Sequence, residues 1–158
     1  MGDKKVLVVH YSRSGTTRKL AEAIASVLNC DIEEIRDTTD RSGLFGWLRA
    51  GRDAFFKKLT VLEDVRTDPG GYDLVVIGTP VWAGSMSCAT RTYISRFKGR
   101  LKEVVFFATM GNSVGNTFRQ MEELCGKKPL ACLALKTKRV RKGDFQESVE
   151  TFIEQMGL

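Results

Sequence analysis

The sequence is poor in the residues that build metal sites and disulfide frameworks. It contains one histidine, His10, and four cysteines that lie far apart and form no C-x-x-C pair. A structural zinc site needs several clustered Cys or His ligands, and disulfide frameworks belong to secreted chains. We therefore expect no metal site. We interpret the cysteines as buried or half-buried thiols in a reducing compartment: Cys30, Cys88, Cys125 and Cys132.

Long apolar segments are also missing. No apolar run approaches the ~18 residues of a membrane span, and the run at Val6–Val9 is too short for the apolar region of a signal peptide. We therefore expect a cytoplasmic protein. Hydrophobic residues make up 42% and charged residues 28% of the 158 residues, as in an ordinary globular chain. This length fits one compact domain over residues 1–158.

Positive charge exceeds negative charge, and the formal net charge is +6. Such an excess favours acidic partners, an anionic surface or an anionic ligand. Part of it lies in the basic run 136–142, which contains Lys136, Lys138, Arg139, Arg141 and Lys142. We interpret this run as a solvated turn between a strand and a helix, with a docking patch as the alternative. Nucleic acid binding is disfavoured because no aromatic residues interleave the run.

Short apolar runs alternate with longer segments of helical periodicity. The expected strands are Val6–Val9, Asp31–Ile35, Leu74–Ile77 (ended by Gly78), Val104–Ala108 and Leu130–Leu135. The expected helices include Leu20–Leu28, Cys88–Phe97, Asn116–Cys125 and Asp144–Met156. This alternation predicts an α/β fold, a three-layer doubly wound five-stranded parallel sheet with helices on both faces.

Residues 41–59 allow two interpretations. Four apolar residues share one helical face: Leu44, Leu48, Phe55 and Leu59. The basic residues lie mostly on other faces: Arg49, Arg52, Lys57 and Lys58. The first interpretation is a helix whose apolar face covers the sheet. The alternative is a basic amphipathic element at the surface that meets a membrane or a partner.

Hydroxyl side chains surround one glycine directly after the first expected strand. The segment reads Ser12, Arg13, Ser14, Gly15, Thr16 and Thr17, and it leads into a helix. A helix N-terminus offers free N–H groups and the positive end of the dipole, which suits a phosphate. The glycine patterns of Walker and dinucleotide-binding loops are absent. The segment is therefore a candidate phosphate loop, and an N-cap turn that merely starts a helix is the alternative.

This loop resembles the [ST]-x-[ST]-G-x-T loop of the flavodoxin family, which Ser12, Ser14, Gly15 and Thr17 match. In that family the loop holds the phosphate of FMN. The resemblance implies FMN as the cofactor and the strand order 2-1-3-4-5. It covers nearly the whole chain, with the middle segment as its least certain part.

Two further loops extend the resemblance. The segment after the third strand is similar to the family's Y-P-[IV]-W-x-G loop, which flanks the flavin ring: Thr79, Pro80, Val81, Trp82, Ala83 and Gly84. Trp82 maps onto the position that stacks on the flavin, and a core anchor at a strand end is its alternative role. The third loop is glycine-rich but has no aromatic residue: Thr109, Met110, Gly111 and Asn112. The second flavin face would be covered by Met110 or Trp47, or left open to a substrate.

The resemblance implies an FMN-binding electron-transfer protein that passes electrons between a reductase and a redox partner. The alternative is an NAD(P)H-dependent FMN oxidoreductase that reduces a quinone or a similar small acceptor. A docking module without flavin is a third possibility from another class. The basic charge predicts a partner with an acidic docking surface. No catalytic residue is assigned, and we interpret His10 as structural.

Overall fold

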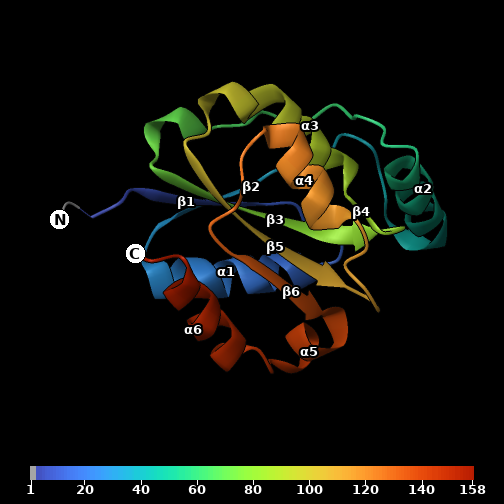
Figure 1. Cartoon of the computed structure of the whole chain (residues 1–158). Coiled ribbons are helices and arrows are strands. Elements are labelled where there is room, and N and C mark those ends of the chain that lie inside the picture. Colours follow the sequence, from blue (N-terminus) through green and yellow to red (C-terminus); the bar gives the residue numbers. More distant parts are fainter. Residues whose placement is uncertain (1–2) are drawn as a thin grey trace.

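The computed structural model describes residues 3–158, and its centre is a twisted parallel sheet (Figure 1). Its parallel strands are β1 (Val6–His10), β2 (Asp31–Glu34), β3 (Leu74–Trp82), β5 (Glu103–Met110) and β6 (Cys132–Lys136). The short strand β4 (Ser85–Met86) pairs antiparallel with the end of β3. The order across the sheet is β2-β1-β3-β5-β6. When only the parallel strands are numbered, β5 and β6 become the fourth and fifth strands. The order is then 2-1-3-4-5, so the predicted order is confirmed.

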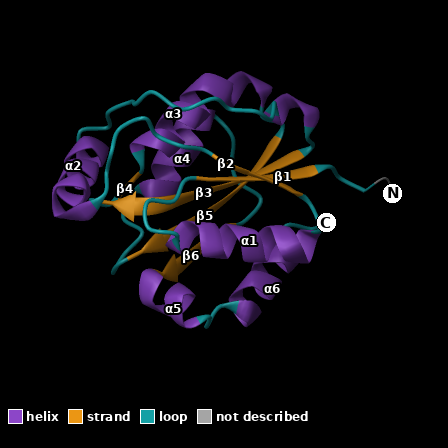
Figure 2. Cartoon of the chain, turned by 180° about the vertical axis from the view of Figure 1, so that it is seen from behind, coloured by secondary structure: helices purple, strands orange, loops and turns teal. Residues whose placement is uncertain are grey.

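Helices cover both faces of the sheet, which confirms the three-layer α/β class (Figures 1 and 2). One face carries α1 (Thr16–Leu28), α5 (Thr137–Lys142) and α6 (Gln146–Gln155), and the other carries α3 (Cys88–Phe97) and α4 (Thr117–Cys125). Short 3-10 turns lie at Pro69–Gly71 and Lys98–Arg100. Side chains alternate along each strand, so each face has its own core. In β1, Leu7 and Val9 belong to one core, and Val6 and Val8 to the other.

Strand β3 continues beyond the end that the sequence predicted for it. Gly78 does not stop the strand, because it pairs with Phe107, and the pairing extends to Pro80 opposite Thr109. A Cβ atom on Gly78 would lie 2.0 Å from Cζ of Phe107. Glycine is therefore required here because the aromatic ring occupies the space of a side chain. The prediction of a break at Gly78 was wrong for that reason.

Residues 41–59 contain helix α2 (Gly43–Phe55), but its apolar stripe does not cover the sheet. The buried positions of α2 are Gly46, Ala50, Asp53 and Ala54. The residues predicted to face the core are exposed: Leu44, Leu48, Phe55 and Leu59. The prediction of a helix was right, but the prediction that its large apolar side chains are buried was wrong. The helix is buried through the face with small side chains, which lets α2 approach its neighbours closely.

The basic run 136–142 was wrongly predicted as a turn. Lys136 ends β6, and the following residues form α5. A helical turn here buries Val140 completely while the basic side chains stay exposed. Gly143, at φ 78°, ends α5, so the last helix begins at Gln146 rather than at Asp144. Cys132 is exposed, in contrast to the expectation for the cysteines.

Candidate functional site

Three loops meet at the carboxyl ends of β1, β3 and β5. The sheet order reverses between β1 and β3, and such a switch point is where ligands bind in doubly wound folds. A buried hydrogen bond of 2.8 Å joins the hydroxyls of Thr17 and Thr109, so the first loop touches the third. The third loop runs on to Asn116, directly before α4, and the backbone N–H of Asn116 donates to the carbonyl of Gly84 at 2.8 Å, so the second loop also touches the third. The topology thus brings the three predicted segments together.

The first loop is shaped by residues close to one another in sequence. The Ser12 hydroxyl oxygen accepts hydrogen bonds from the N–H groups of Gly15 (3.0 Å) and Arg18 (3.2 Å). Gly15 adopts the left-handed region at φ 92°, which turns the chain into α1. Thr16 and Thr17 are the first residues of this helix. Their N–H groups therefore have no hydrogen-bond acceptor within the helix. The loop therefore offers free donors at its helix end.

A cavity of about 260 Å³ lies where the loops meet. It is lined by Arg13, Ser14, Thr16, Thr17, Trp47, Pro80, Val81, Trp82, Thr109, Gly111, Thr137 and Arg141. Most of these residues were predicted. Thr137 and Arg141 were not among the predicted site residues, although they lie within the basic run 136–142. Their position directly after the last strand, at the same edge of the sheet, is the signal that could have placed them here.

The other predicted residues do not line the cavity. Thr79 is fully buried; its hydroxyl donates to the carbonyl of Pro80 and accepts from the N–H of Ser87. Ala83 and Gly84 have φ angles of 49° and 72° and make the turn from β3 into β4. The remaining ones, Ser12, Gly15, Met110 and Asn112, are also outside its lining, and Ser12 and Gly15 shape the first loop through their hydrogen bond.

Trp82 reaches the cavity but is largely packed into the protein. Its residue exposure is 8%, and it belongs to the core on the α3 side of the sheet. The Tyr11 ring meets it edge-on at 5.5 Å between centroids, and the Arg41 guanidinium lies 5.6 Å from its ring centroid. The indole is therefore fixed from the protein side, and its stacking on a flavin stays a prediction.

The electrostatics of the cavity are positive. Among residues 3–158, those that line it include two arginines, Arg13 and Arg141, and no carboxylate. His10, at the end of β1, adds no charge, because burial lowers its pKa to about 4. Both nitrogens of its ring are buried without a hydrogen-bond partner in the described part of the chain. The arrangement suits an anionic ligand and provides no pair of groups for acid–base chemistry.

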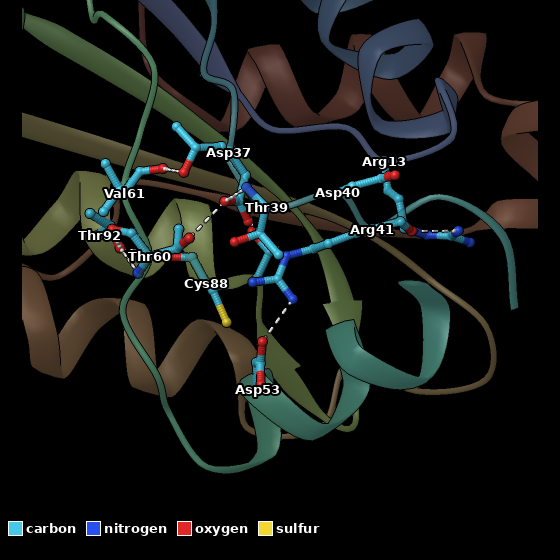
Figure 3. Close-up of polar contacts among 12 residues, drawn as sticks. Arg13, Asp37, Thr39, Asp40, Arg41, Asp53, Thr60, Val61, Cys88 and Thr92 are labelled. Carbon is cyan, nitrogen blue, oxygen red and sulfur yellow. Dashed lines mark hydrogen bonds and ion pairs between the residues drawn. The ribbon is translucent and has the colours of Figure 1, made fainter. Parts of the chain in front are cut away.

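A buried ion-pair network fixes the segment beside the cavity (Figure 3). The Arg41 Nε donates to Asp37 at 2.7 Å, and its Nη1 donates to Asp53, on α2, at 2.9 Å. The Thr60 hydroxyl donates to the second oxygen of Asp37 at 2.6 Å. Arg13 of the first loop donates to the backbone carbonyl of Arg41 at 3.5 Å. Helix α2 is thereby held next to the cavity that Trp47 helps to line.

No protein-family model matches the chain, and no curated protein sequence matches it significantly. Solved structures do match it. A candidate flavoprotein from Bacteroides uniformis superposes with a TM-score of 0.80 at 24% identity, over 97% of this chain and 99% of that chain. A Lactobacillus acidophilus flavoprotein in complex with FMN gives a TM-score of 0.72 at 24% identity, over 89% and 98% of the two chains.

A flavodoxin from the domain Archaea gives a TM-score of 0.61 at 19% identity, over 97% of this chain and 96% of that chain. These likenesses span nearly the full length of each partner. They show that the chain has the flavodoxin-like fold that the loop motifs predicted. At such identities the likeness concerns the fold.

Proposed function

We propose that the chain binds one FMN in this cavity and passes electrons between a reductase and a redox partner. The observation that carries the proposal is the loop from Ser12 to Thr17. It combines a left-handed glycine, free N–H groups at a helix start and hydroxyls that line the cavity. Each of these features favours a phosphate group.

The donor set fits the phosphate end of FMN. A dianion gains from the positive end of the α1 dipole and from charge-assisted hydrogen bonds. Ser14 and Thr16 supply hydroxyls, and Arg13 and Arg141 supply positive charge. Thr17 contributes its N–H group, while its hydroxyl is engaged with Thr109. We assign these residues to phosphate binding.

The ring end of the cofactor would lie between the second and third loops. The cavity is smaller than the ~300–1000 Å³ of sites that enclose a whole ligand, so a bound flavin would keep part of its ring exposed. When bound, FMN supplies the transfer of electrons, and the protein supplies binding and orientation. An exposed ring edge suits exchange with a second protein. The FMN seen in the Lactobacillus structure and the flavodoxin from Archaea support the same proposal.

A second candidate function rests on the third loop. That loop contributes Thr109 and Gly111 to the cavity but no aromatic side chain. A flavin face without an aromatic cover is accessible to a nicotinamide donor, as in an NAD(P)H-dependent oxidoreductase with a small acceptor such as a quinone. A visible spectrum of the FMN-loaded protein separates the two functions. Bleaching by NADPH alone supports the oxidoreductase, and reduction only through a partner reductase supports the carrier.

FMN binding itself is tested by titration calorimetry on Ser14→Ala. Ser14 is exposed at the cavity, so the substitution removes a hydroxyl without leaving a buried partner unpaired. We expect a loss of about 1–2 kcal/mol of binding free energy, roughly 5–30-fold in Kd. Ser26→Ala, on the exposed surface of α1 and away from the loop, is the matched control and should bind FMN like the unchanged protein. Equal Kd values for both variants would contradict the phosphate loop, and no heat of FMN binding would refute the cofactor.

A further inference from the structure

Helix α2 and the turn after it expose a dense group of large apolar side chains. We call this group the apolar ridge; it consists of Leu44, Phe45, Trp47, Leu48, Phe55, Phe56 and Leu59. Phe45 is 85% exposed, and Phe55 and Phe56, which stack edge-on at 5.3 Å, are each 65% exposed. Scattered single apolar residues are normal on a protein surface, but a group of large exposed apolar side chains within one short segment favours an interaction site. The ridge therefore requires an explanation.

The backbone of α2 makes the exposure of the ridge unavoidable. The helix packs against the protein with Gly46, Ala50 and Ala54, whose side chains are small. A Cβ on Gly46 would lie 2.0 Å from the backbone carbon of Arg41, so the chain that leads into α2 already lies against the first turn of the helix. Asp53, also on this face, is bound to Arg41 at 2.9 Å. The helix cannot turn its large side chains inward without breaking this ion pair.

Basic side chains flank the ridge. Arg49, Arg52, Lys57 and Lys58 are all exposed, and residues 43–61 contain one acidic residue, Asp53. That carboxylate is buried and paired with Arg41, Arg52 and Lys58, so it presents no free negative charge at the surface. The exposed part of this segment is thus apolar and cationic. This combination is typical of helices that lie in the interface of an anionic membrane.

The ridge projects at one end of the molecule. Figures 1 and 2 show α2 beyond the carboxyl ends of the strands, apart from the helix layers formed by α3 with α4 and by α1 with α6. A projecting row of side chains can enter a lipid interface without a complementary groove, and Trp and Phe are well suited to that depth. A second copy of the chain fits less well, because pairing two ridges would bring two cationic surfaces together.

We propose that the apolar ridge binds the surface of anionic lipid membranes and anchors the protein there peripherally. No helix in residues 3–158 is long and apolar enough to cross a membrane, so the contact is made from one side. The proposal does not depend on FMN. Because Trp47 belongs to the ridge and also lines the cavity, membrane binding would turn the carboxyl edge of the sheet, with the cavity, toward the lipid.

The test is co-sedimentation of the full chain with vesicles of phosphatidylglycerol and phosphatidylcholine, compared with phosphatidylcholine alone. We expect binding to the anionic vesicles, weakened by salt. The double variant Phe45→Gln/Phe55→Gln should reduce the partition coefficient roughly tenfold or more. Arg49→Gln/Lys57→Asn should reduce it about tenfold. Matched controls at exposed sites elsewhere, Val27→Gln/Leu130→Gln and Lys98→Gln/Lys128→Gln, should bind as the unchanged protein does.

Tryptophan fluorescence gives a second readout on the same samples. Trp47 is 56% exposed and Trp82 is buried, so a blue shift of the emission on adding anionic vesicles reports Trp47 entering the lipid. The shift should be absent in Trp47→Phe. The proposal is overturned if anionic vesicles do not bind the protein, or if the ridge and control variants bind equally. It is also overturned if light scattering shows a ridge-dependent dimer, or if only an acidic protein binds the ridge.

Discussion

The phosphate loop and the segment from Asp37 to Val61 border the same cavity, but different forces shape them. In the loop, the Ser12 hydroxyl bonds to N–H groups only a few residues away, and a glycine supplies the left-handed turn. In the segment, Arg41 bonds to the carboxylates of both Asp37 and Asp53. Its guanidinium also lies against Trp82, the last residue of β3. The turn of the loop is set by partners a few residues away, whereas the segment also depends on partners farther along the chain, Asp53 and Trp82.

This difference decides what a sequence can predict. Hydroxyls around one glycine indicate a loop because the hydrogen bonds of Ser12 and the left-handed turn at Gly15 are local. Apolar periodicity in residues 41–59 indicates a helix but cannot say which side is buried. That choice depends on the ion pairs of Arg41 and on close packing at Gly46, which no periodicity reveals. We therefore expect mutations in the ion-pair network of Arg41 to change the unfolding free energy more than mutations in the phosphate loop do.

The largest effect is expected for Arg41→Met. The Arg41 and Asp37 side chains are 3% and 2% exposed, so the variant would leave the buried carboxylate of Asp37 without its cation, while Asp53 keeps its pair with Arg52. Breaking such a buried pair costs about 3–5 kcal/mol of unfolding free energy. Urea denaturation measures the loss. Arg119→Met removes an exposed pair with Glu123 and should change stability by less than about 0.5 kcal/mol. Similar losses in the two variants would show that the network does not hold the segment.

Most of the fold was predictable because buried parallel strands and their helices leave strong local signals. The order of the parallel strands and both helix layers followed from these signals and from the resemblance of the loops. The ion pairs of Arg41 could not be predicted, because neither the spacing to Asp37, four residues away, nor that to Asp53 indicates that these charged side chains are buried together. Arg141 was missed for a similar reason. A basic run in sequence does not show which of its members faces the cavity.

The next effect contrasts two glycines on α2. Gly46→Ala places a methyl group 2.0 Å from the Arg41 backbone, which cannot give way as a flexible side chain could. We expect a loss of about 2–3 kcal/mol in unfolding free energy. A Cβ on Gly51 meets nothing within 4 Å, so Gly51→Ala should raise stability by about 0.5–1 kcal/mol through helix propensity. If the two variants changed the unfolding free energy equally and in the same direction, Gly46 would not be packed against the Arg41 backbone.

The smallest effect is expected in the loop, where glycine serves conformation rather than space. Gly15 has φ 92°, and a Cβ there would meet nothing within 4 Å. Gly15→Ala should therefore cost about 1–2 kcal/mol, the strain of a left-handed alanine, and Gly15→Asn should cost less because asparagine tolerates this region. Urea denaturation of both variants measures the difference. If asparagine were as costly as alanine, the constraint on Gly15 would come from contacts, as at Gly46, and the contrast between the two regions would fail.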